Sequence, residues 1–145
     1  MQIRDILRDK GTQVYSIGPD NTVYEAIEKM SDKNIGALLV MQGNDLKGII
    51  TERDYRNKVI LKGRTSKSTP VKEIMTREVF CVEPNDSVET CMALMTDRKF
   101  RHLPVMDGNK VAGVISIGDL VKAVISKQKV EINNLRDYIG GSYPG

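Results

Sequence analysis

The sequence contains an internal repeat, which limits its fold more than any other feature. A shift of 65 positions lays residues 19–54 over residues 84–119 without a gap, and 12 of these 36 positions are identical. Most of the other positions keep their apolar or polar character. Because one copy of a short structural repeat cannot bury its apolar face alone, the two copies are expected to pack against each other. The repeat therefore predicts two related halves within the 145 residues.

Both copies carry the signals of two helices. Thr22 and Glu25 have the spacing of a capping box at a helix start. Apolar side chains then recur at helical spacing, and we interpret them as core: Val23, Ala26, Ile27 and Met30 in the first copy, and Val88, Cys91, Met92 and Met95 in the second. A second helix is expected to begin near Asp54 in the first copy and near Asp119 in the second.

Extended segments and hairpins complete each copy. Residues 14–17 and 79–82 are predicted to be short extended segments, each followed by a turn at a proline. Turns that contain Gly43 and Gly108 separate pairs of apolar runs, which is typical of β-hairpins. The runs are 37–41 with 46–51, and 103–106 with 111–116. Each copy is thus expected to be β-α-β-β-α, which makes the chain a mixed α/β (α+β) protein.

The repeat also divides the chain. We assign residues 1–62 to the first repeat, 63–128 to the second, and 129–145 to a C-terminal helix and tail. The residues IRDIL and VKEIM, which begin at Ile3 and Val71, are a further echo ahead of the copies. The C-terminal segment carries an apolar stripe, which we expect to pack on the body or on a second subunit. Its members are Ile132, Leu135, Tyr138 and Ile139.

Composition argues against several classes of protein. The net charge is only +3, and aromatic residues make up 5% of the chain, so neither charge nor base stacking points to nucleic acid. The longest apolar run, residues 35–41, is far shorter than the roughly 20 residues of a membrane span. With a charged N-terminus, this predicts a cytoplasmic protein. One histidine and two cysteines make no zinc ligand set, and we expect Cys81 and Cys91 to be buried.

Residues 53–72 are strongly basic, with seven lysines and arginines against one acidic residue. We interpret this segment as a helix tail followed by a solvated linker. The alternative is that it attracts a phosphate or an acidic partner.

Two equivalent motifs carry the chemistry, at residues 48–54 and 113–119. In each, a glycine and two apolar residues end a strand, a hydroxyl residue follows, and an aspartate comes three positions later. The pairs Thr51/Asp54 and Ser116/Asp119 are therefore expected to point into one cleft each, because one helical turn brings such residues together. Such a cleft would suit a nucleotide. The carboxylate would accept hydrogen bonds from a ribose diol, and the hydroxyl and the free backbone N–H groups at the helix start would bind a phosphate. The alternative is that both pairs are helix caps.

These residues resemble a tandem cystathionine β-synthase (CBS) domain pair, also called a Bateman module. The resemblance covers residues 1–128 and rests on the two Gly-x-x-[Thr/Ser]-x-x-Asp motifs, the repeat, and residues 101–105. It implies that the repeats are related by a pseudo-twofold axis, pack sheet to sheet, and leave two clefts that hold adenosine-containing ligands. It also implies a flat dimer.

The resemblance assigns the ribose to Asp54 and Asp119 and the hydroxyl position to Thr51 and Ser116. The adenine would lie against two neighbouring strands in each cleft, at Tyr15, Ile17 and Ala37, and at Phe80, Val82, Leu103 and Pro104. From the side-chain chemistry, Arg101 with a protonated His102 suits a phosphate, and Arg53 lies beside Asp54. Glu52, in contrast, argues against a highly charged ligand in the first cleft.

The sequence thus predicts a non-catalytic regulatory module that senses an adenine nucleotide. AMP or NAD is expected ahead of ATP, ADP and S-adenosylmethionine. The expected partners are a second copy of the chain and a regulated protein, with no metal, nucleic acid or membrane. The alternative is a ligand-independent dimerisation or docking module. An enzyme is not expected, because the chain lacks a P-loop, a dinucleotide fingerprint and a visible nucleophile–base set.

Overall fold

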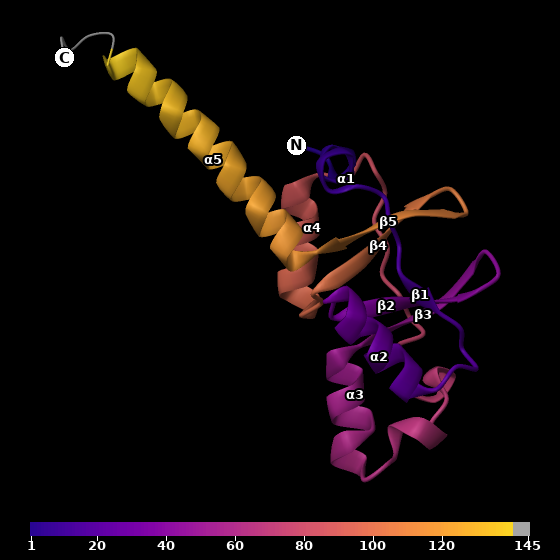
Figure 1. Cartoon of the computed structure of the whole chain (residues 1–145). Coiled ribbons are helices and arrows are strands. Elements are labelled where there is room, and N and C mark those ends of the chain that lie inside the picture. Colours follow the sequence, from indigo (N-terminus) through magenta and orange to yellow (C-terminus); the bar gives the residue numbers. More distant parts are fainter. Residues whose placement is uncertain (141–145) are drawn as a thin grey trace.

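Two small sheets, one from each copy of the repeat, lie at the centre of the molecule and carry helices on their outer faces (Figure 1). The computed structural model describes the backbone of residues 1–140 and the side chains of residues 1–137. The α-helices are α1 (Ile3–Lys10), α2 (Val23–Lys33), α3 (Glu52–Lys58), α4 (Val88–Arg98) and α5 (Ile117–Gly140). The strands are β1 (Ser16–Ile17), β2 (Ala37–Gln42), β3 (Asp45–Thr51), β4 (His102–Asp107) and β5 (Lys110–Ser116). Short 3-10 turns η1 (Ile60–Lys62), η2 (Ser66–Ser68) and η3 (Val71–Glu73) connect the copies.

The sequence prediction of two βαββα repeats, packed sheet to sheet, is confirmed as the fold class. β2 pairs antiparallel with β3, and β4 with β5. Gly43 and Gly108 form the hairpin turns with φ of +62°, a conformation that glycine adopts without strain. Thr22 and Glu25 form the expected capping box, and Val23, Ala26 and Met30 are buried below it.

The extended segment predicted at residues 79–82 is only partly formed. In the first copy, β1 pairs in parallel with β2, and the N–H of Leu39 donates to the carbonyl of Tyr15 at 3.2 Å. The position equivalent to Leu39 is Pro104, which has no N–H to donate to Phe80. A single parallel bridge between Val82 and Val105 therefore replaces the strand.

The prediction for Cys81 is wrong, whereas that for Cys91 is confirmed. Cys91 lies on the inner face of α4 and is buried in the second core, whereas Cys81 is exposed. In an extended segment successive side chains point in opposite directions, and here Val82 faces the core. Cys81 therefore faces outward.

The segments ahead of the two copies are exchanged between the cores. Ile3, Ile6 and Leu7 of α1 pack with the second copy, and the N–H of Ile3 donates to the carbonyl of Asp86 at 2.9 Å. Conversely, Val71, Ile74 and Met75 pack with the first copy. Figure 1 shows α1 beside α4 and β5, with the chain then passing down to β1. Each core is thus completed by a segment that precedes the other copy in the sequence.

The last helix, α5, leaves the body. Its first turns pack on the second core through Leu120, Ala123 and Val124, and the rest extends outward (Figure 1). Ile132 and Leu135 of the predicted stripe are exposed, so this part of the stripe does not pack on the body. The side chains of Tyr138 and Ile139 lie outside the described ones. Within the described residues, no helix has the length and apolar character needed to cross a membrane.

Candidate functional site

A cleft of about 1020 Å³ lies between the two copies. Its walls come from the end of β3 and the start of α3 in the first copy, and from the chain before β4 and the end of β5 in the second. Of the residues proposed from the sequence, eight line this cleft: Thr51, Arg53, Asp54, Phe80, Arg101, His102, Leu103 and Ser116. The remaining six lie outside its lining: Tyr15, Ile17, Ala37, Val82, Pro104 and Asp119. The structure thus brings the first motif together with Arg101 and with two of the adenine positions assigned to the second copy, Phe80 and Leu103.

The close approach of an exchanged segment explains the glycine that opens each motif. A Cβ on Gly48 would lie 2.7 Å from the carbonyl oxygen of Thr76, which pairs with Ile49. A Cβ on Gly113 would lie 2.7 Å from a methyl carbon of Leu7. In both copies the glycine therefore makes room for the chain that crosses from the other repeat.

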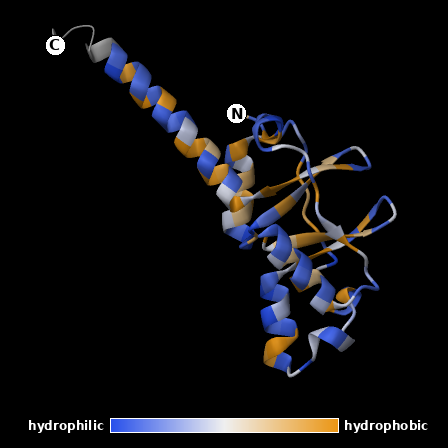
Figure 2. Ribbon diagram, in the orientation of Figure 1, coloured by the Kyte–Doolittle hydropathy of each residue, from blue (hydrophilic) through white to orange (hydrophobic). Residues whose placement is uncertain are grey.

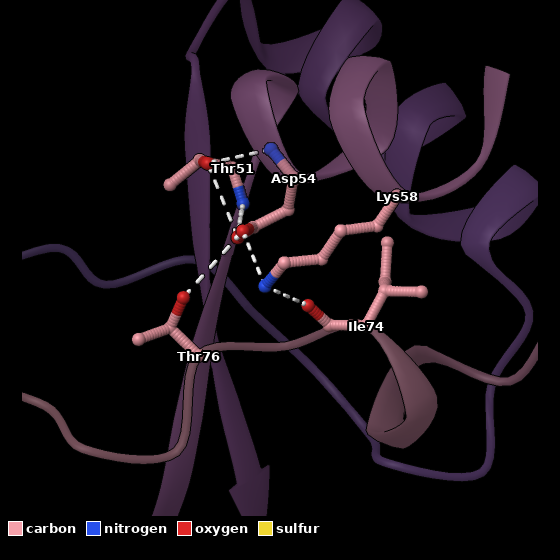
Figure 3. A network of polar contacts seen from close by, with 5 residues as sticks. All are labelled: Thr51, Asp54, Lys58, Ile74 and Thr76. Atoms are coloured by element: carbon pink, nitrogen blue, oxygen red, sulfur yellow. Dashed lines mark hydrogen bonds and ion pairs between the residues drawn. The ribbon is translucent and has the colours of Figure 1, made fainter. Parts of the chain in front are cut away.

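The carboxylate of Asp54 is the centre of a polar network (Figure 3). The N–H of Asp54 donates to Thr51 Oγ1 at 3.1 Å, and the N–H of Thr51 donates to Asp54 Oδ2 at 3.1 Å. Lys58 Nζ lies 3.0 Å from Asp54 Oδ1 and also donates to the carbonyl of Ile74 at 2.9 Å. Thr76 donates to Oδ1 at 3.5 Å. The aspartate is only 8% exposed, so Lys58 neutralises a charge that burial would otherwise destabilise.

This geometry shows that the Thr51/Asp54 pair is a reciprocal helix cap. The cap occupies Oδ2 of Asp54, whereas Oδ1 points toward Lys58 and Thr76 at the cleft. A ligand hydroxyl would have to bind Oδ1 by joining or displacing these two side chains. Capping and ligand binding are therefore compatible at this residue, because they use different oxygens.

The second motif caps its helix in the same way but has a different cation. The N–H of Asp119 donates to Ser116 Oγ at 3.1 Å, and the N–H of Ser116 donates to Asp119 Oδ2 at 2.9 Å. Lys10, at the end of α1, donates to the same Oδ2 at 2.5 Å and to the carbonyl of Val114 at 2.7 Å. Burial alone would raise the pKa of Asp119, but the hydrogen bonds from Lys10 and Ser116 and the charge of Lys10 outweigh it and lower the pKa. The exchanged helix thus places a lysine directly on the second aspartate.

The surroundings of His102 favour its neutral form. Burial lowers the pKa of His102 from its ordinary value of 6.5, and the charges of Lys10 and Arg101 lower it further, against the opposing effect of Asp119. The imidazole is therefore mainly neutral at pH 7 and offers one donor and one acceptor. Only Arg101 of this pair brings a positive charge to the cleft.

The cleft contains residues that the sequence did not single out. Arg56, Asn57 and Lys58 follow Arg53 on α3, and their helical spacing was a readable signal. Thr76, Glu78 and Val79 come from the exchanged segment, and no local pattern points to them. Phe100 joins Phe80 at the wall, with ring centroids 5.2 Å apart.

The lining charges are mixed but net positive. Five cationic side chains and three carboxylates line the cleft. The cations are Arg53, Arg56, Lys58, Lys99 and Arg101, and the carboxylates are Glu52, Asp54 and Glu78. Farther along the basic segment, Arg64 pairs with Glu73, and Lys72 pairs with Asp20. The basic segment is thus divided, with its first part in the cleft and Arg64 and Lys72 of its later part in ion pairs away from it.

The fold and the cleft define a class of protein. It is a module of two βαββα repeats that exchange the segments ahead of them and have a polar cleft between them. The CBS domain family model matches this chain twice, at residues 3–60 and 71–126, and the chain belongs to that family. It is 42% identical over 150 residues to the mitochondrial CBS domain-containing protein CBSX3 of Arabidopsis thaliana, covering 97% of this chain and 73% of that protein.

Solved structures agree with this assignment. A protein with CBS domains from Burkholderia ambifaria MC40-6 is 53% identical, with a TM-score of 0.85 over 88% of this chain and 96% of that chain. The CBS domain pair of protein MJ0100, in complex with 5-methylthioadenosine and S-adenosyl-L-methionine, has a TM-score of 0.78 over 88% of this chain and 98% of that chain. At 23% identity, this last likeness shows the fold alone.

Proposed function

We propose that this chain is a non-catalytic regulatory module in signal transduction, which binds an adenosine-containing ligand in the cleft between its repeats. The ligand is AMP or NAD ahead of ATP, ADP and S-adenosylmethionine. Binding changes how the module contacts a second copy of itself or a regulated protein. Such a change follows when the ligand binds one arrangement of the repeats more tightly than another.

One observation carries this proposal, namely that a single cleft joins Asp54 to Phe80 and Arg101. A carboxylate accepts hydrogen bonds from a ribose diol, an aromatic wall contacts a base, and a guanidinium binds a phosphate. The volume of about 1020 Å³ lies just above the roughly 300–1,000 Å³ typical of small-molecule sites. The mixed charge of the lining favours a ligand with few phosphates over one with many.

Calorimetric titration of the purified chain with the five adenosine compounds named above tests the proposal. Asp54→Asn is the informative variant, because the amide oxygen still caps the helix while the negative charge is lost. A hydrogen bond to a charged group contributes about 1.5–3 kcal/mol, so we expect affinity to fall about 10- to 150-fold.

Asp119→Asn is the matched control, since Asp119 occupies the equivalent position outside the cleft lining. We expect it to leave the affinity of the cleft within about threefold, which is less than 1 kcal/mol. No binding of any adenosine compound, or equal affinity in both variants and the original chain, would refute the site.

The capping geometry supports a second candidate function. Both motifs are satisfied as reciprocal helix caps without any ligand. We infer that the chain serves as a ligand-independent dimerisation or docking module if no nucleotide raises its melting temperature. A thermal-shift series with the same nucleotides separates the two functions, because a ligand that binds only the folded state raises its stability.

A further inference from the structure

The outer part of α5 has no neighbour within the described chain. Every residue from Ile125 to Asp137 is exposed, and the helix extends away from the body in Figure 1. An isolated helix of this length is marginal in water, and most helices in proteins gain their stability by packing an apolar face. Figure 2 shows apolar segments recurring among polar ones along this helix.

The exposed apolar residues follow the spacing of a coiled-coil seam. Val121, Ile125, Ile132 and Leu135 recur at intervals of four, seven and three residues. This spacing places Ile125 and Ile132 at the a positions of a heptad, with Val121 and Leu135 at d positions and the polar Gln128 at the d position between them. Both a positions are β-branched and the last d position is leucine, and β-branched residues at a with leucine at d favour two strands. Val130 is also exposed but falls at an f position, away from the seam.

The charges beside the seam favour a parallel pair of identical helices. The e positions are all basic, at Lys122, Lys129 and Arg136, whereas the next g position is Glu131. In a parallel pair, a g residue meets the e residue of the following heptad on the other helix, so Glu131 meets Arg136 of a second copy. An antiparallel pair would place the two basic flanks against each other, which is unfavourable.

We propose that α5, from Val121 to Leu135, forms a parallel two-stranded coiled coil with a second copy of this chain. This inference rests on the dimer that belongs to the proposed function, and it specifies the interface. The twofold axis runs along the helix and places both bodies at its N-terminal end. Since the cleft residues do not lie on this part of α5, the interface is separate from the ligand site.

Sedimentation velocity of the full chain tests the seam. Val130 and Leu135 are both 58% exposed on the same helix, and Ile132 is 49% exposed. The double variant Ile132→Glu/Leu135→Glu places charges in the seam of both helices. Because two copies of each apolar side chain lose their partner, we expect the dissociation constant of the dimer to rise at least about 100-fold.

Val130→Glu is the matched control, and we expect it to change that constant by less than about threefold. These side chains lie outside both cores, and protection of the buried Cys91 from a thiol reagent checks that the body is folded. A dimer that persists in the double variant would overturn the coiled coil but leave dimerisation intact. A monomeric original chain would overturn both, and the nucleotide titration would still stand on its own.

Disulfide trapping tests the orientation. In a Cys81→Ser background, which removes the exposed thiol, Leu135→Cys is expected to form a crosslinked dimer on mild oxidation. A parallel pair holds two d positions of the same number side by side. Crosslinks that form instead only between Val121→Cys and Ile132→Cys chains would overturn the parallel arrangement.

Discussion

The ion pair between Lys10 and Asp119 joins the exchanged helix α1 to the second motif, and replacing Lys10 with methionine tests its strength. The variant keeps most of the aliphatic side chain and removes the charge. Lys10 Nζ donates to Asp119 Oδ2 at 2.5 Å and to the carbonyl of Val114 at 2.7 Å. The two side chains of the pair are 33% and 23% exposed, so solvent screens the interaction in part.

The expected loss can be worked out from these contacts. Hydrogen bonds to charged groups contribute about 1.5–3 kcal/mol when buried, and partial exposure reduces this to about 1–2 kcal/mol here. For a chain of this size, we expect the melting temperature to fall by about 3 to 8 °C. Urea unfolding followed by circular dichroism measures the free energy of unfolding, and the double variant Lys10→Met/Asp119→Asn completes the cycle. We expect a coupling energy of about 1 kcal/mol between the two sites.

The effect should also depend on pH. Because the pKa of Asp119 in the folded chain is lowered below its ordinary value of 3.8, the carboxylate stabilises the fold above about pH 4. That stabilisation is lost as the pH falls through the lower folded-state pKa, where the aspartate becomes protonated. The difference between the original chain and Lys10→Met should therefore be full well above pH 3.8 and shrink as the pH falls below that value. Equal stability of the two proteins at pH 7, or a difference that grows in acid, would refute this account.

Further expectations concern the glycines and the cysteines. Gly48→Ala should lower the free energy of unfolding by about 2–3 kcal/mol, since its Cβ would meet the backbone oxygen of Thr76. Gly113→Ala should cost less, about 1–2 kcal/mol, because only the end of the Leu7 side chain must move; equal costs in urea unfolding would contradict this difference. Burial and the charge of Asp86 raise the pKa of Cys91 to about 11, so a thiol reagent should label Cys81 alone in the native chain and both cysteines after unfolding. Rapid native labelling of Cys91 would contradict its burial in the second core.

Interactions between residues close in sequence were predictable. The Thr22–Glu25 capping box, the hairpin turns and the helix starts at both motifs involve neighbours, and the repeat doubled each signal. The cleft at Asp54 could be predicted in part, because Thr51 and Arg53 belong to the same motif. Such features depend on local hydrogen bonds and on the period of the apolar pattern.

Features that join distant residues could not be predicted in the same way. Lys10 and Asp119 are 109 positions apart, and no pattern within either copy pairs them. The exchange of the segments that contain α1 and η3 depends on which core accepts the apolar side chains of each segment. Because the two segments have similar sequences, the sequence does not tell which core each one joins. The missing strand at residues 79–82 did have a local cause, the proline at position 104, but its effect appears only once the partner strand is known.

The crossing of the segments ahead of each copy has a consequence for synthesis on the ribosome. When residue 62 has emerged, the first hairpin and its helices are available, but Val71, Ile74 and Met75, which complete their core, are not. Meanwhile α1 waits for Val88, Cys91 and Leu103, which are made much later. The first core can therefore be completed only after Met75 has emerged, whereas α1 stays without its core until the second copy has been made.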